Sequence, residues 1–293
     1  MLLRITIDIF SGRENPVIEL SGKEAREAID RLRPARKLER GEAGLPPAPT
    51  LGYRGLIIEQ VKEPIDLLPK AFRFAHGAIF GPGLALRAAD EAFEDFVCGS
   101  TGLIRKLSLE PKFQKFVRQE IERFRETRAK WPWKQKPVWP IKKVCKCAPL
   151  YEPAWWNDGG QRQMHNNCYN YGTNYRSDTF AQPGLAAGAM YTQKTCASVK
   201  AAAVKDALID SPAADNKWPN EGHLVALVVA PGYDFHWYRK GRNRYWSHKP
   251  GSGQVTNLDN SGTTIPDPRT ANRGPYTDFC TFMVVMHGHI KIK

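Results

Sequence analysis

The 293-residue sequence lacks any long apolar stretch. Its longest apolar run, residues 224–230, is far shorter than the roughly 20 residues that a helix needs to cross a bilayer. The sequence therefore predicts a soluble globular protein without a transmembrane segment. Its length is generous for a single hydrophobic core and favours two domains.

The N-terminus also lacks the uninterrupted apolar core of a secretory leader. Apolar and polar residues alternate over residues 3–9, and no small-residue cleavage site follows. This pattern predicts a β-strand in place of a signal peptide. We expect either a cytosolic protein or one exported by a route that needs no cleaved leader.

Cysteine is scarce, with six residues in the whole chain. That number is too small for a disulfide scaffold in a protein of this size, so reduced thiols are expected. Cys98, Cys196 and Cys280 have apolar or alanine-rich neighbours and are predicted to be buried packing residues.

Acidic residues are few in one segment. Residues 101–150 contain 14 Lys and Arg against 4 Glu, within a chain of net charge +13. Such a segment would attract an anionic polymer or surface, such as nucleic acid, a membrane or a bacterial wall. The alternative interpretation is a solvated helix followed by a solvated linker.

Composition divides the chain into three parts. Residues 1–129 predict a small α+β module of unknown role, with strands at 3–9, 17–20, 55–59 and 71–80, a loop at 34–50, and helices following Ser21 and spanning 84–97 and 104–129. Residues 130–153 mix tryptophan, lysine and five prolines, which predicts an extended basic linker. The third part, residues 154–293, has the composition of a compact domain.

This C-terminal part predicts an α+β fold in which a cysteine-bearing segment precedes a helix and an antiparallel sheet. An alanine-rich stretch predicts the helix at 194–209. Strand patterns follow at 223–229, 235–239, 245–247 and 279–286, with turn sequences between them.

Three residues of this part could form a nucleophilic site. Cys168 follows Asn166 and Asn167, which favour helix starts, and a helix start or an adjacent imidazolium lowers a thiol pKa. A strand–turn–strand hairpin would bring His236 and His248 together. One imidazole would then accept the thiol proton while the other orients it.

These residues resemble the NlpC/P60 cysteine peptidases of the papain-like clan. The resemblance covers roughly residues 155–293. Residues 222–225 resemble the family's first strand, 236–238 its base-bearing strand and 246–248 its orienter strand, and His236 and His248 are twelve residues apart. The cysteine lacks the usual Ser-Gly after it, so a different branch of the clan fits equally well.

The resemblance implies a cysteine peptidase or amidase that needs no cofactor. Cys168 would attack an amide carbonyl, His236 would act as base and then acid, and His248 would hold the imidazole. The Cys168 backbone N–H with Tyr151, Asn166 or Asn167 would bind the oxyanion. Peptidoglycan stem peptides are the expected substrate, and a delivered antibacterial toxin is one permitted role.

Two alternatives remain open at this point. A papain-like thioester site can also carry out deamidation or acyl transfer. Alternatively, the domain could be a basic binding module stabilised by zinc, in which Cys168 is a structural ligand and not a nucleophile. The four potential zinc ligands are Cys145, Cys147, His165 and Cys168.

Overall fold

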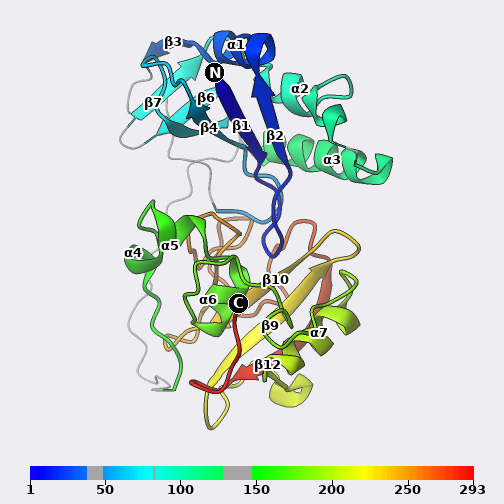
Figure 1. Ribbon diagram of the computed structural model, residues 1–293. Coiled ribbons are helices and arrows are strands. Elements are labelled where there is room, and N and C mark those ends of the chain that lie inside the picture. The colour runs from blue at the N-terminus through cyan, green and yellow to red at the C-terminus, as the bar shows by residue number, and fades with distance from the viewer. Residues whose placement is uncertain (38–48, 82–83, 108, 128–146) are drawn as a thin grey trace. The chain divides into compact units, whose positions relative to one another are not determined.

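The computed structural model describes residues 1–37, 49–81, 84–107, 109–127 and 147–293 (Figure 1). Contacts divide the chain into two compact units. Unit 1 comprises Met1–Ile9, Asn15–Ala48 and Tyr53–Trp133, and unit 2 comprises Phe10–Glu14, Pro49–Gly52 and Lys134–Lys293. Of the linker expected at 130–153, only residues 147–153 lie within the described part.

Unit 1 is built on a seven-stranded antiparallel sheet with strand order β2-β1-β4-β5-β6-β7-β3. Strands β1 and β2 alternate buried and more exposed residues, so one face of each supplies the core. The strands are β1 (Leu2–Ile7), β2 (Val17–Ser21), β3 (Pro34–Lys37), β4 (Leu56–Lys62), β5 (Ala71–Ala75), β6 (Ala78–Gly81) and β7 (Leu84–Ala88).

Within the described residues, four helical segments complete unit 1: α1 (Gly22–Leu32), α2 (Phe93–Cys98), the 3-10 turn η1 (Leu103–Lys106) and α3 (Pro111–Thr127). Two predictions for this unit are wrong. The predicted loop at 34–50 begins with strand β3, and the predicted helix at 84–97 begins with strand β7. Strand β7 pairs with both β6 and β3, so ladder hydrogen bonds override the helical spacing.

A buried ion cluster lies beside the first strand of unit 1. The fully buried Asp8 carboxylate accepts hydrogen bonds from Arg54 at 2.5 Å and from Arg73 at 2.7 Å. Burial raises the pKa of Asp8, but the two guanidinium groups outweigh it and lower the pKa to about 2. Asp8 is therefore ionised in the folded protein at neutral pH.

Unit 2 contains a five-stranded antiparallel sheet with strand order β11-β10-β9-β12-β8. Helix α6 packs on β10, and α7 packs on β9 and β12 (Figure 1). Its elements are α4 (Pro153–Trp156), α5 (Gln161–Met164), α6 (Cys168–Thr173), α7 (Cys196–Lys205), β8 (Ile209–Asp210), η3 (Pro212–Ala214), β9 (His223–Ala230), β10 (Asp234–Lys240), β11 (Trp246–His248) and β12 (Asp278–Val285).

Both faces of this sheet are buried. Every residue of β9 is buried, and alternate residues point to different clusters. Val225, Leu227 and Trp237 pack on one face with Cys168 and α7. Leu224, Ala226 and Tyr238 pack on the other face, beneath the loops that follow β11.

Disulfide bonds overturn the expectation of reduced thiols. Cys196, at the start of α7, is bonded to Cys280 in β12 across 84 residues of sequence. Cys147 is also disulfide-bonded. The interpretation of Cys196 and Cys280 as packing residues is therefore wrong, whereas Cys98 is a buried free thiol, as predicted.

The fold class is mixed α+β with antiparallel sheets, which confirms the coarser part of the prediction. Among the described residues, no helix combines the length and the apolar character needed to cross a membrane.

Candidate functional site

Cys168 is the first residue of helix α6, as the sequence predicts. Asn167 is the N-cap, and its side-chain oxygen accepts from the backbone N–H groups of Tyr169 at 2.9 Å and Asn170 at 3.2 Å. The Asn170 side chain in turn accepts from the Asn167 N–H at 3.1 Å. This reciprocal capping box fixes the backbone that presents Cys168.

The Cys168 thiol lies against the strand that carries His236. Its Sγ is 3.9 Å from the carbonyl oxygen of Phe235, and the Trp237 N–H points to the sulfur. Strand β11 pairs only with the end of β10, from Tyr238 onward, and leaves this edge of β10 open to the thiol. The sulfur thus contacts the peptide groups on both sides of His236.

The two histidines form a direct pair. His236 Nε2 and His248 Nδ1 are 3.0 Å apart, with ring planes at 88°. Both side chains are fully buried, on the face of β10 that also carries Tyr238. The structure therefore brings together the two histidines that the hairpin spacing predicts.

The hydrogen-bond chain determines the tautomers of this pair. His248 Nε2 is 2.9 Å from the Leu258 carbonyl oxygen, and a carbonyl only accepts, so His248 Nε2 carries the hydrogen. In neutral His248, Nδ1 is then an acceptor, and the hydrogen between the rings belongs to His236 Nε2. Neutral His236 therefore has its basic lone pair on Nδ1.

Lys249, next to His248, is a site residue that the sequence analysis missed. Its buried ammonium donates at 2.6 Å to each of three carbonyl oxygens, those of Gln163, Asn166 and Gly251. The contact with Asn166 ties β11 to the backbone just before the nucleophile. A lone lysine after a strand gives no sequence signal for this role.

Asp234 is a second residue that the sequence analysis missed. This buried carboxylate accepts from the backbone N–H groups of Ser11 at 2.5 Å and of Gly12 and Arg13 at 3.2 Å each. The Tyr276 hydroxyl donates to it at 2.5 Å. Residues 11–13, here called the 11–13 segment, are thus part of unit 2 and lie beside the site.

Among the predicted oxyanion residues, only Asn167 directs its amide toward the 11–13 segment, donating to the Gly12 carbonyl at 2.8 Å. Asn166 Nδ2 donates instead to the backbone carbonyl of Arg162 and to the carboxylate of Asp178. Tyr151 packs with a separate cluster of Trp156, Tyr171 and Val255.

Burial dominates the electrostatics of the thiol. It raises the pKa of Cys168 well above its usual value, and the Asp234 charge raises it further. The Trp237 N–H and the Lys249 ammonium act in the opposite direction. In this closed arrangement Cys168 is therefore a neutral thiol.

The zinc hypothesis loses one of its ligands, because Cys147 is disulfide-bonded. Cys145 lies outside the described residues. Within the described ranges, no cluster of three His, Cys, Asp or Glu side chains could hold a metal ion.

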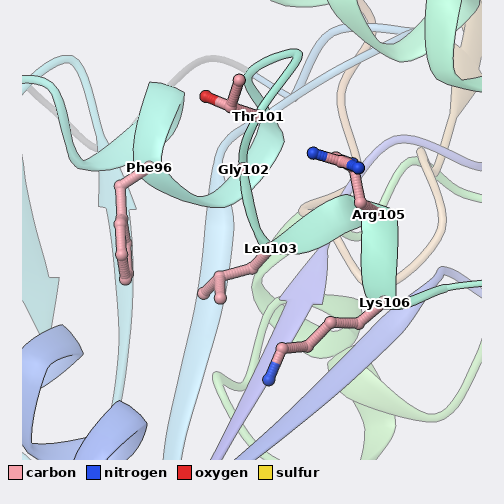
Figure 2. A pocket seen from close by; sticks show the side chains of 6 residues that line it. All are labelled: Phe96, Thr101, Gly102, Leu103, Arg105 and Lys106. Carbon is pink, nitrogen blue, oxygen red and sulfur yellow. The ribbon is translucent and has the colours of Figure 1, made fainter.

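Several positive charges of the basic segment, residues 101–150, are paired with nearby carboxylates. Four of its described cations form ion pairs with acidic partners: Lys106 with Glu24, Lys112 with Glu110, Arg123 with Glu120 and Arg125 with Asp95. Figure 2 shows a pocket at η1 whose lining contains no cysteine, histidine or carboxylate; it is formed by Phe96, Thr101, Gly102, Leu103, Arg105 and Lys106.

Comparison with known proteins gives one informative relative. No family model and no solved structure matches the chain. The chain is 46% identical over 140 residues to insoluble matrix shell protein 1 of Ruditapes philippinarum, which is 47% of this chain and 91% of that protein. Because nearly half of the aligned residues are identical over almost the full length of the relative, the chain belongs to the family of insoluble matrix shell protein 1.

Proposed function

We propose that unit 2 is a papain-like cysteine hydrolase that cleaves an amide bond through a thioester on Cys168. The observation that carries this proposal is the hydrogen-bond chain from Leu258 through His248 to His236, which leaves the basic nitrogen of His236 at Nδ1. The Cys168 thiol contacts the peptide groups on both sides of that residue.

The proposed reaction begins with transfer of the Cys168 proton to His236 Nδ1. The thiolate attacks the amide carbonyl carbon, and the Cys168 N–H stabilises the resulting oxyanion. Protonated His236 then gives its proton to the leaving amine, the C–N bond breaks and a thioester remains. Water, deprotonated by His236, cleaves the thioester and releases the acid and the thiol.

His248 acts in this scheme as a positioning residue. It accepts from His236 and donates to the Leu258 carbonyl, so it holds both the ring orientation and the tautomer of the base. Lys249 anchors the backbone before Cys168 and adds positive charge that favours the thiolate.

The test is mass spectrometry of peptides and purified muropeptides after incubation with the full chain. The Cys168→Ala variant should lose all turnover, while Cys98→Ala, which removes the other free thiol of the described residues, should keep it. Turnover that survives in Cys168→Ala removes the nucleophile and the proposal with it. A product joined to an added amine would instead assign acyl transfer to the same thioester.

The role of His248 has a separate test. We expect His248→Ala to lower kcat by about 10², with a smaller loss in His248→Asn, whose amide can still accept from His236. The pH profile of kcat/KM should also shift in His248→Ala, because the base loses its partner. Equal losses with unchanged pH profiles would indicate a packing role only.

A second candidate function comes from the relative. Its name describes an insoluble matrix shell protein, and Cys168 here is buried with a raised pKa. We propose as the alternative a non-catalytic component of an insoluble matrix, for which the disulfides suit an oxidising environment. Absence of turnover on every amide substrate, with Cys168 inert to a peptide electrophile, would favour this alternative.

A further inference from the structure

We infer that the 11–13 segment fills a peptide-binding subsite of the Cys168 site, and that this subsite accepts a bent peptide segment with glycine at the position facing Phe235. This inference rests on the proposed function and names the substrate class of the same site.

The segment is held through its main chain. Three successive N–H groups, those of residues 11–13, donate to the single carboxylate of Asp234. The Gly12 carbonyl accepts from two side-chain amides, Asn167 Nδ2 at 2.8 Å and Gln182 Nε2 at 2.7 Å. Contacts to backbone donors and acceptors recognise any peptide of this shape, whatever its other side chains.

The requirement for glycine comes from space. A Cβ on Gly12 would lie 2.5–2.6 Å from atoms of the Phe235 ring, much closer than real Cβ contacts allow. The φ angle of Gly12 lies outside the left-handed region, so the backbone itself would admit other residues. The Phe235 ring is therefore the element that selects glycine.

The subsite adjoins the reacting groups along two separate stretches of chain. Asn167 immediately precedes Cys168, and Phe235 immediately precedes His236. Cys168 and His236 are both fully buried while the segment is bound. Two side-chain amides donate to one carbonyl oxygen, and one of them belongs to the residue before Cys168; an oxyanion would need donors of this kind. The segment thus occupies the place of a substrate peptide and keeps the thiol from solvent.

The first test measures access to Cys168 in the full-length chain. Iodoacetamide labelling is followed over time and located by peptide mass spectrometry. Gly12→Leu should expel the segment and speed Cys168 labelling by about tenfold or more. Gly160→Leu is the matched control, because a Cβ there would have its nearest neighbour at 3.9 Å. Unchanged labelling in a folded Gly12→Leu protein overturns the inference.

The second test measures occupancy of the vacated subsite. A blocked peptide of residues 10–14, Phe-Ser-Gly-Arg-Glu, should slow labelling of Gly12→Leu toward the wild-type rate. The same peptide with leucine in place of glycine should not protect. Equal protection by both peptides, or protection by neither, contradicts the glycine subsite.

Should Gly12→Leu fail to fold, Gln182→Ala removes one of the two donors to the Gly12 carbonyl and should speed labelling several-fold. Labelling and protection report access and binding, not turnover. A negative result in the labelling or protection assay therefore does not change the outcome of the Cys168→Ala hydrolysis test. A negative result in the hydrolysis test likewise does not change the labelling and protection data.

Discussion

His223, the first residue of β9, shows how burial controls a single side chain. It is fully buried, and its Nε2 donates to the Gly172 carbonyl at 2.8 Å. Burial lowers its pKa to about 3, while the Gly172 contact acts in the opposite direction. Its Nδ1 has no hydrogen-bond partner among the described residues, so a proton there would be an unpaired buried charge. His223 is therefore neutral in the folded protein.

The stability of unit 2 should consequently fall in mild acid. Between pH 6.5 and about 3 the unfolded chain binds a proton at His223 that the folded chain does not, so the free energy of unfolding decreases as pH falls. The slope from this residue is at most about 1.4 kcal/mol per pH unit. Urea unfolding at pH 7 and pH 4.5 measures it. His223→Gln, which can still donate to Gly172, should lose this part of the slope; an unchanged slope would contradict the assignment.

At the scale of elements, the Cys196–Cys280 disulfide joins helix α7 to strand β12, which lies next to the edge strand β8. Residues of both elements pack in the same hydrophobic core. Linking residues 84 positions apart restricts the unfolded chain strongly. We expect Cys196→Ser with Cys280→Ser to lower the free energy of unfolding by about 4 kcal/mol. Calorimetry of the double variant provides the measurement. A Tm equal to that of the wild type would show that the link adds no stability.

Sequence patterns predict elements well where a single local signal decides. Strands β9 to β12 follow apolar runs between turn residues, and the capped start of α6 follows from adjacent Asn167 and Cys168, whereas β8 begins at the end of the predicted helix 194–209. The local pattern fails at β3, where a loop is predicted, and at β7, where a helix is predicted. Pairing between residues 34–37 and 86–88 makes both segments strands. Pairing across some 50 residues has no local signature.

The residues of the candidate site likewise fall into those that a local sequence pattern predicts and those that it does not. His236 and His248 meet because one hairpin carries both, so their spacing is informative. Asp234 binds residues 223 positions earlier in the sequence, and Lys249 binds carbonyls more than 80 positions earlier. Neither contact leaves a pattern in the sequence, because the partners are backbone groups, which every residue possesses.

At the scale of the whole molecule, the two units carry buried ionisable groups that respond to different ranges of acidity. The contribution of His223 to the free energy of unfolding of unit 2 falls as the pH drops below about 6.5. In unit 1 the lowered pKa of Asp8 means that its stabilisation is complete above pH 3.8 and is lost as pH falls toward about 2. From these two residues we expect unit 2 to lose stability at a higher pH than unit 1.

Hydrogen exchange followed by mass spectrometry can test this order, because it reports each unit separately. Peptides of unit 2 should lose protection at a higher pH than those of unit 1. Asp8→Asn should destabilise unit 1 at neutral pH by roughly 3 kcal/mol, since it removes the carboxylate charge that pairs with the buried Arg54. Glu19→Gln, at an exposed ion pair with Arg4, serves as control and should change little. Loss of protection in unit 1 first would refute the order.

Residues 10–14 and 49–52 belong to unit 2 although the sequence around them belongs to unit 1. A truncated protein starting after residue 133 would therefore omit part of its own fold. Asp234 would keep the hydroxyl of Tyr276 and lose three amide donors, and Asn260 would lose both of its bonds to Leu51. Activity or solubility measured on such a fragment would describe a damaged molecule, and dissection of this chain has to retain both short N-terminal pieces.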